Sequence, residues 1–203
     1  VLSELANAGG AYIIVSSKGT VADGPLESRR AAMRDALAEH PSAHKLHIDF
    51  YDRERLATWI NQYPGVAVWV RERTGRPLSG WRSLGDWSGI RVGGDGQYIT
   101  DHTACVLDTR TREPKIRPVV EGINCIRSVL VEHAQCVRLI GMSGVGKTRL
   151  VQALFESDVG SDAIDPSLAI YTDYSEPPIP TAKQLALHLI ETGQRAMVIV
   201  PTS

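Results

Sequence analysis

The stretch VRLIGMSGVGKT, residues 137–148, decides the fold of the second half of the chain. Its first four residues form a short apolar segment typical of a strand, and residues 149–155 continue with the character of a helix. The loop between them has the pattern G-x-x-x-x-G-K-[ST], which holds phosphates when a strand precedes it and a helix follows it. The sequence therefore predicts a P-loop between a strand and a helix.

The residue types in this loop indicate how it would hold a nucleotide. Glycines allow successive backbone N–H groups to turn inward on the phosphates. Lys147 would reach the β- and γ-phosphates as the predicted catalytic residue, and the Thr148 hydroxyl is the predicted magnesium ligand. We expect ATP with Mg²⁺, and the sequence leaves GTP open. The predicted nucleotide-binding residues are Gly141, Met142, Ser143, Gly144, Val145, Gly146, Lys147, Thr148 and Arg149.

Two further strands are predicted after the P-loop, at residues 168–171 and 196–200. Between them, Thr181 and Gln184 have the spacing of a capping box, which predicts the start of a helix. Residues 196–200 suit the Walker B strand of a P-loop protein. We expect a later strand to lie between this strand and residues 137–140 in the sheet.

An acidic residue that supports magnesium normally ends a Walker B strand. Here Pro201, Thr202 and Ser203 follow the predicted strand, so the sequence assigns no residue to hydrolysis. Asp173, after the strand at 168–171, is a candidate for the magnesium site, although an aspartate that caps a turn is the more common case.

The first part of the chain predicts a separate α/β layer. Residues 11–16 are a compact β-branched run that predicts a buried strand, and residues 46–50 alternate apolar and polar side chains like a strand with one packed face. Helical patterns mark residues 26–37, 53–62 and 64–73. The order strand, helix, strand, helix indicates an α/β layer, with right-handed crossovers if the strands are parallel.

Residues 75–96 are rich in glycine and contain Trp81 and Trp87. Because a flexible linker seldom contains two tryptophans, this segment predicts a structured connector. A short strand at 104–108 and a helix at 123–133 follow. We therefore predict three segments, which are an α/β part at residues 1–75, the connector at 76–121 and the P-loop part at 122–203.

Composition narrows the function classes. Lys and Arg total 22 against 23 Asp and Glu, so no overall basic field attracts nucleic acid and any such contact must be local. The longest apolar run, residues 196–200, is far shorter than the roughly 20 residues of a membrane helix. Three cysteines without a close pair favour a reducing compartment. We expect a cytoplasmic protein without membrane contact, which extends upstream of Val1 because no initiator Met or signal peptide is present.

The P-loop part resembles a known family. VRLIGMSGVGKTRLVQALF at residues 137–155, the preceding helix at 122–132 and YTDYSEPPIPT at 171–181 resemble the NTPase module of bacterial STAND proteins. They are most similar to the antiviral STAND ATPases that sense phage proteins. The resemblance covers roughly residues 120–203, the start of such a module. It implies the first half of a P-loop NTPase parallel sheet.

The upstream part resembles the segment that joins an Mrr-like restriction-endonuclease domain to such an NTPase. The resemblance lies in GGAYIIVSSKG at 9–19, the run from LHIDFYDRERL to VRER at 46–73, and GWRSLGDW at 80–87. It implies that residues 1–75 are the C-terminal half of that α/β domain and that its catalytic carboxylates lie earlier. Ser16-Ser17-Lys18 imitates the Glu/Gln-x-Lys motif, but Ser16 offers magnesium no carboxylate or amide.

A replacement acidic cluster of Asp49, Asp52 and Glu54 is a second interpretation of the upstream part, although an exposed charged turn explains these residues more simply. We therefore expect no nuclease activity from these 203 residues.

These observations predict a nucleotide switch in antiphage defence. The resemblance implies a homo-oligomer on activation, a C-terminal sensor for a foreign protein outside this sequence, and a nuclease effector that contacts DNA. Two alternatives remain open. One is a general P-loop ATPase whose hydrolysis drives work directly, and the other is a DNA-binding module with a degenerate nuclease domain.

Overall fold

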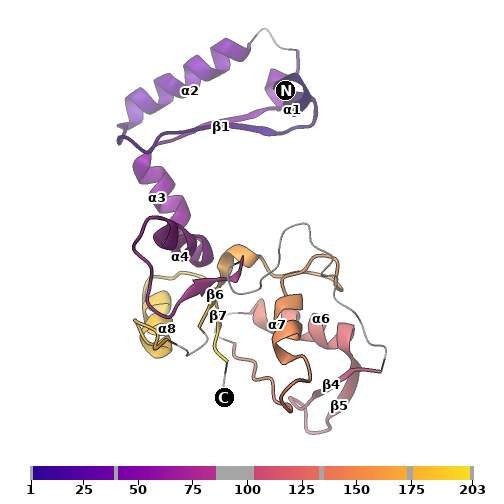
Figure 1. Cartoon of the computed structure of the whole chain (residues 1–203). Coiled ribbons are helices and arrows are strands. Elements are labelled where there is room, and N and C mark those ends of the chain that lie inside the picture. Colours follow the sequence, from indigo (N-terminus) through magenta and orange to yellow (C-terminus); the bar gives the residue numbers. More distant parts are fainter. Residues whose placement is uncertain (1, 39–40, 86–102, 133–134, 173–175, 202–203) are drawn as a thin grey trace. The chain divides into compact units, whose positions relative to one another are not determined.

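The computed structural model describes residues 2–38, 41–85, 103–132, 135–172 and 176–201, and shows a mixed α/β protein (Figure 1). It divides into two compact units, Val1–Tyr63 and Pro64–Ser203. The helix that begins at Pro64 packs within the second unit, whereas the sequence segments place it in the first part. The division into an α/β part, a connector and a P-loop part stays a prediction, with the bounds 1–75, 76–121 and 122–203.

The first unit is a two-stranded parallel sheet whose strands are connected through a helix. Each residue of β1 pairs in register with β2, from Ala11 opposite His47 to Val15 opposite Tyr51. The predicted strands and helices are confirmed, with bounds that differ by a few residues. The elements are α1 (Leu2–Asn7), β1 (Ala11–Val15), α2 (Asp23–Leu37), η1 (Ala43–Lys45), β2 (His47–Tyr51) and α3 (Arg53–Asn61).

Strand β1 is not buried, contrary to the prediction from its apolar run. Tyr12, Ile13, Ile14 and Val15 are 37% to 54% exposed. Helix α2 packs on β2, where Phe50 is buried. The apolar β-branched run therefore predicted the strand correctly. Whether the strand is buried depends on which other elements cover it.

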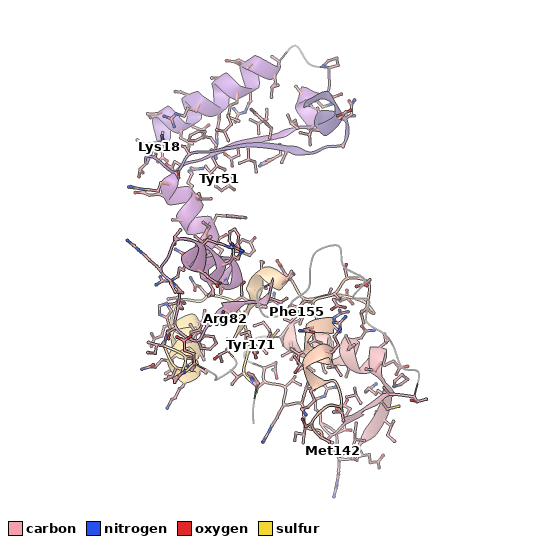
Figure 2. All side chains as sticks on the ribbon, viewed as in Figure 1. Lys18, Tyr51, Arg82, Met142, Phe155 and Tyr171 are labelled. Atoms are coloured by element: carbon pink, nitrogen blue, oxygen red, sulfur yellow. The ribbon has the colours of Figure 1, made fainter. Side chains whose placement is uncertain are left out.

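The second unit contains a three-stranded mixed sheet in the order β3-β6-β7. Strands β6 and β7 are parallel, as expected, while β3 from the connector pairs antiparallel with β6, so that Arg82 lies opposite Tyr171 (Figure 2). The elements are α4 (Pro64–Arg73), β3 (Arg82–Ser83), β4 (Cys105–Asp108), β5 (Lys115–Pro118), α6 (Val119–Leu130), α7 (Lys147–Ala153), η2 (Pro166–Leu168), β6 (Ala169–Tyr171), α8 (Ala182–Glu191) and β7 (Met197–Ile199).

Alternate residues of β6 enter two different hydrophobic cores. Ala169 joins a core with Ile123 of α6 and Ala153 of α7, whereas Ile170 joins a core with Val68 of α4 and Leu185 of α8. Because successive side chains of a strand point to opposite faces, the sheet has helices on both faces. The predicted capping box of Thr181 and Gln184 is present at the start of α8.

The predicted strand at residues 137–140 is wrong, since this segment joins none of the strands in the described part of the chain. Val137 and Leu139 still pack against the core that contains Ile123, while Ile140 is 82% exposed. The apolar residues of this segment therefore pack on the core without forming the backbone hydrogen bonds of a strand with the described strands. The predicted strand order around this segment stays a prediction. Asp173 and Trp87 lie outside the described residues.

The connector is part of the second unit, because Trp81 anchors it. Trp81 is 3% exposed, and its Nε1 donates to the Pro180 carbonyl at 2.7 Å. The adjacent Gly80 has φ +70°, and a Cβ there would lie 2.6 Å from the Glu176 carbonyl oxygen. The structured connector expected from the tryptophans is thus confirmed at Trp81.

Gly80 and Gly75 provide a matched test of this close approach. Both have left-handed φ, +70° and +73°, but a Cβ at Gly75 would meet nothing within 4 Å. Gly75→Ala should cost about 1 kcal/mol of the free energy of unfolding, because only the backbone conformation is strained. Gly80→Ala should cost at least about 1 kcal/mol more, because the backbone at residues 176–178 must move. Urea unfolding followed by circular dichroism measures both, and equal losses would contradict the packing.

One carboxylate of the β-hairpin β4–β5 binds two arginines of the hairpin and lies beside α6. Asp108 accepts hydrogen bonds from Arg110 Nε and NH2, both at 2.9 Å, and from Arg117 Nε at 3.3 Å. The Cys125 thiol of α6 lies 3.6 Å from Asp108 Oδ2. Hydrogen bonds from the Arg110 side chain and backbone N–H hold the pKa of Asp108 well below its usual range.

This lowered pKa predicts a pH-dependent contribution to stability. A carboxylate whose pKa is lower in the folded than in the unfolded protein stabilises the fold above its unfolded pKa, about 4 for Asp. Asp108→Asn should therefore be less stable than the wild type at pH 7, with a difference that narrows as the pH falls below about 4. Urea midpoints between pH 3 and pH 7 measure it, with Glu113→Gln on the same hairpin as control. A difference independent of pH would contradict the ionic role of Asp108.

Within the part of the chain that the structure describes, no helix combines the length and the apolar character needed to cross a lipid bilayer.

Candidate nucleotide-binding site

The predicted P-loop curls around the ammonium group of Lys147. Lys147 Nζ donates hydrogen bonds to the carbonyl oxygens of Gly141, at 2.8 Å, and of Met142, at 2.7 Å. The loop therefore closes on the side chain that the motif assigns to the phosphates. Met142 is 79% exposed and lies at the periphery of the unit (Figure 2).

Two glycines give the loop this shape. Gly144 has φ +82° and Gly146 has φ +85°, a left-handed conformation that is strained for residues with a Cβ. Gly146 is the N-cap residue of α7, so the predicted helix begins directly at Lys147. Gly146 is the second glycine of the motif, so backbone geometry explains the requirement there, whereas Gly144 lies at a position where the motif accepts any residue.

The loop is chemically suited to a triphosphate and a magnesium ion. Residues 141–146 and Thr148 are exposed, and Lys147 is half-buried. The Lys147 ammonium is a compact cation held at the loop, and the neighbouring Thr148 hydroxyl is a hard oxygen of the type that magnesium prefers. The two side chains that the motif assigns to phosphate and metal are therefore adjacent at an open surface.

Arg149, which is also a predicted nucleotide-binding residue, has a protein partner. Its NH1 pairs with Glu156 Oε1, and its NH2 donates to Glu156 Oε2 at 2.8 Å. The Glu156 side chain is 14% exposed and that of Arg149 is 32% exposed. The Arg149 side chain thus contacts Glu156, just after the C-terminal end of α7. Its contact with nucleotide stays a prediction.

Sequence reasoning missed Arg127 of α6, which is 1% exposed and binds the segment after the P-loop helix. Its guanidinium donates to five backbone carbonyls at distances from 2.5 to 3.0 Å. Burial lowers the pKa of Arg127 from its ordinary value, but arginine stays protonated in proteins. The five carbonyls belong to Ala153, Leu154, Glu156, Val159 and Ser161.

The Ala153 and Leu154 carbonyls lie at the C-terminal end of α7, where a helix leaves its carbonyl groups without intrahelical partners, and the other three belong to the loop that follows. Asn124, one turn earlier on α6, also accepts a hydrogen bond from Ser161 N at 3.0 Å. The available sequence signal was a charged residue beside Ile123 and Ile126 on the apolar face of α6. That signal indicates burial, but it does not indicate which carbonyls the arginine binds.

The alternative acidic cluster of the first unit is engaged in structural contacts. Asp49 pairs with Arg30, and Glu54 accepts from Thr20 Oγ1 at 3.3 Å. Asp52 is 2% exposed, so the expectation that all three residues form an exposed turn is wrong. Its carboxylate accepts from Val21 N at 2.8 Å and from Arg55 N at 2.9 Å, which caps α3 and ties it to the segment after β1.

Lys18 is exposed near the ends of β1 and β2, where Figure 2 labels it with Tyr51. Among the described residues, no three His, Cys, Asp or Glu side chains converge in a way that could hold a metal ion. This unit thus presents no acidic metal centre within the described ranges.

No protein-family model, curated protein or solved structure matches this chain. The site is therefore interpreted from its own residues and geometry.

The role of Arg127 predicts a large effect of its removal. Arg127→Met should cost at least about 3 kcal/mol of the free energy of unfolding, because five backbone carbonyls, three of them in buried hydrogen bonds, lose a charged donor. Arg127→Lys keeps the charge with only three N–H donors and should be intermediate. Urea unfolding of both variants is the measurement. A loss below about 1 kcal/mol for Arg127→Met would show that other groups satisfy these carbonyls.

Proposed function

We propose that this chain binds ATP with magnesium at Gly141–Thr148 and functions as a P-loop NTPase. The observation that supports this most directly is the closure of the loop on Lys147 Nζ, with Gly146, the second glycine of the motif, in a left-handed conformation. A triphosphate would replace the Gly141 and Met142 carbonyls as partner of the ammonium group. Backbone N–H groups of the loop would bind the same phosphates.

Each site residue has a distinct role in this proposal. Lys147 would neutralise charge on the β- and γ-phosphates, and Thr148 would hold the magnesium ion. Bound magnesium would supply charge neutralisation between phosphate oxygens. Hydrolysis is part of the proposal through the motif, although no described residue is assigned as the acidic partner of the metal.

The wider role that we propose rests on the resemblance to antiviral STAND ATPases. In such a protein the nucleotide is a switch, because a ligand shifts a conformational equilibrium by its difference in affinity for the two states. The chain would couple recognition of a phage protein to a nuclease effector through homo-oligomerisation in the cytoplasm. Residues 1–75 would be the C-terminal half of an Mrr-like domain, and that domain would contact DNA.

Lys147→Ala tests the nucleotide site. The variant should raise the Kd for ATP at least about tenfold, because a charge-assisted contact to the phosphates is lost while the backbone loop remains. Lys183→Ala removes an exposed lysine from α8 and should leave the Kd unchanged. Isothermal titration with ATP and with GTP, each with magnesium, measures affinity and nucleotide preference. Wild-type affinity in Lys147→Ala would refute the assignment.

Thr148→Ala separates the metal from the phosphates in the same assay. Its affinity should fall when magnesium is present and match that of the wild type when EDTA removes the metal. An equal loss under both conditions would show that Thr148 does not act through magnesium.

A further inference from the structure

We infer that Arg149 and Glu156 form a positioning pair that orients the P-loop helix, with Arg127 holding the pair on α6, and that Arg149 does not bind phosphate. This inference rests on the proposed nucleotide site. It changes the role predicted for Arg149 and adds two residues that the motif does not contain.

The first step is the position of Arg149. It follows Lys147 and Thr148 directly in the first turn of α7, so its side chain constrains the turn that presents them. Both terminal nitrogens of its guanidinium contact the two oxygens of the Glu156 carboxylate. Such a bidentate pair fixes geometry as well as adding energy, because the two planar groups must align.

The second step is the attachment of Glu156 to α6. The carbonyl oxygen of Glu156 accepts from Arg127 NH2 at 2.8 Å, and the same nitrogen donates to Ala153 at 2.7 Å. Arg127 thus binds both the end of α7 and Glu156, whose side chain pairs with Arg149 in the first turn of that helix. A continuous path of hydrogen bonds runs from α6 through Glu156 to Arg149, next to the proposed phosphate and metal ligands.

The third step is the low exposure of the pair. The Glu156 carboxylate is mostly buried, and an Arg149 that turned to a phosphate would leave it without its bidentate partner. Leaving a mostly buried charge unpaired is costly. Lys147 and Thr148 differ from Arg149, because Lys147 donates to loop carbonyls without a carboxylate partner among the described residues and Thr148 is exposed. The geometry therefore separates ligands at 147 and 148 from a positioning residue at 149.

A double-mutant cycle distinguishes positioning from direct phosphate binding. The variants are Arg149→Gln, Glu156→Gln and the double variant, measured by titration of the whole chain with ATP and magnesium. If the pair acts as a unit, each single variant raises the Kd about tenfold and the double variant raises it no further. The exchanged variant Arg149→Glu/Glu156→Arg should restore the Kd to within about threefold of the wild type, because the opposite charges can pair again.

Three controls separate this role from general stability. Arg112→Gln and Glu191→Gln remove exposed charges of the same unit and should leave the Kd unchanged. Leu185→Ala weakens the core on the opposite face of the sheet and should lower the unfolding midpoint without raising the Kd. Circular dichroism at the titration temperature checks that each variant is folded. Glu156→Asp, which keeps the charge on a shorter side chain, gives an intermediate Kd and replaces Glu156→Gln if that variant unfolds.

The outcomes are distinct. A raised Kd in Arg149→Gln with an unchanged Kd in Glu156→Gln or Glu156→Asp makes Arg149 a phosphate ligand and overturns the inference. If no variant of the pair changes the affinity for ATP, the inference is overturned, and the proposed nucleotide site stands. The same holds if Leu185→Ala raises the Kd as much as the variants of the pair do. Wild-type protein that binds neither ATP nor GTP refutes the proposed function and the inference with it.

Discussion

The P-loop part of this structure depends on the hydrogen bonds of one buried guanidinium. Arg127 donates hydrogen bonds to five backbone carbonyls from the end of α7 and the loop that follows, and three of these bonds are buried away from water. Its position on α6 makes that helix the platform against which the short P-loop helix is held. The core around Ile123 then packs α6, α7 and one face of the sheet together.

The sheet of the second unit connects this platform to the rest of the unit. Because residues of β6 alternate between two cores, α6 and α7 pack on one face while α4 and α8 pack on the other. The connector completes the arrangement, since Trp81 joins the second core and β3 pairs with β6. The segment predicted as a structured connector thus contributes a strand and a core residue.

The candidate site combines an open loop with a rigid support. Lys147 and Thr148 lie at the surface, where a nucleotide can reach them, whereas Glu156 and Arg127 behind them are mostly buried. This division is what a nucleotide switch requires, because binding energy alters a conformational equilibrium only if the loop is coupled to the body of the protein. The geometry of the loop supports the proposed nucleotide binding, whereas the proposed role as a switch rests on the resemblance to STAND ATPases.

Sequence alone determined the features that local physics controls. Features that depend on residues a few positions apart were predictable. They are the strands β1, β2, β6 and β7, the helices between them, the capping box at Thr181 and the glycine-rich turn of the P-loop. Only the tertiary structure decided the exposure of β1, the lack of pairing between residues 137–140 and the described strands, the burial of Asp52 and the partners of Arg127. Each of these depends on which element covers or pairs with the segment. Arg127 meets its carbonyls across 26 to 34 residues of sequence, a separation at which no local pattern identifies the partner.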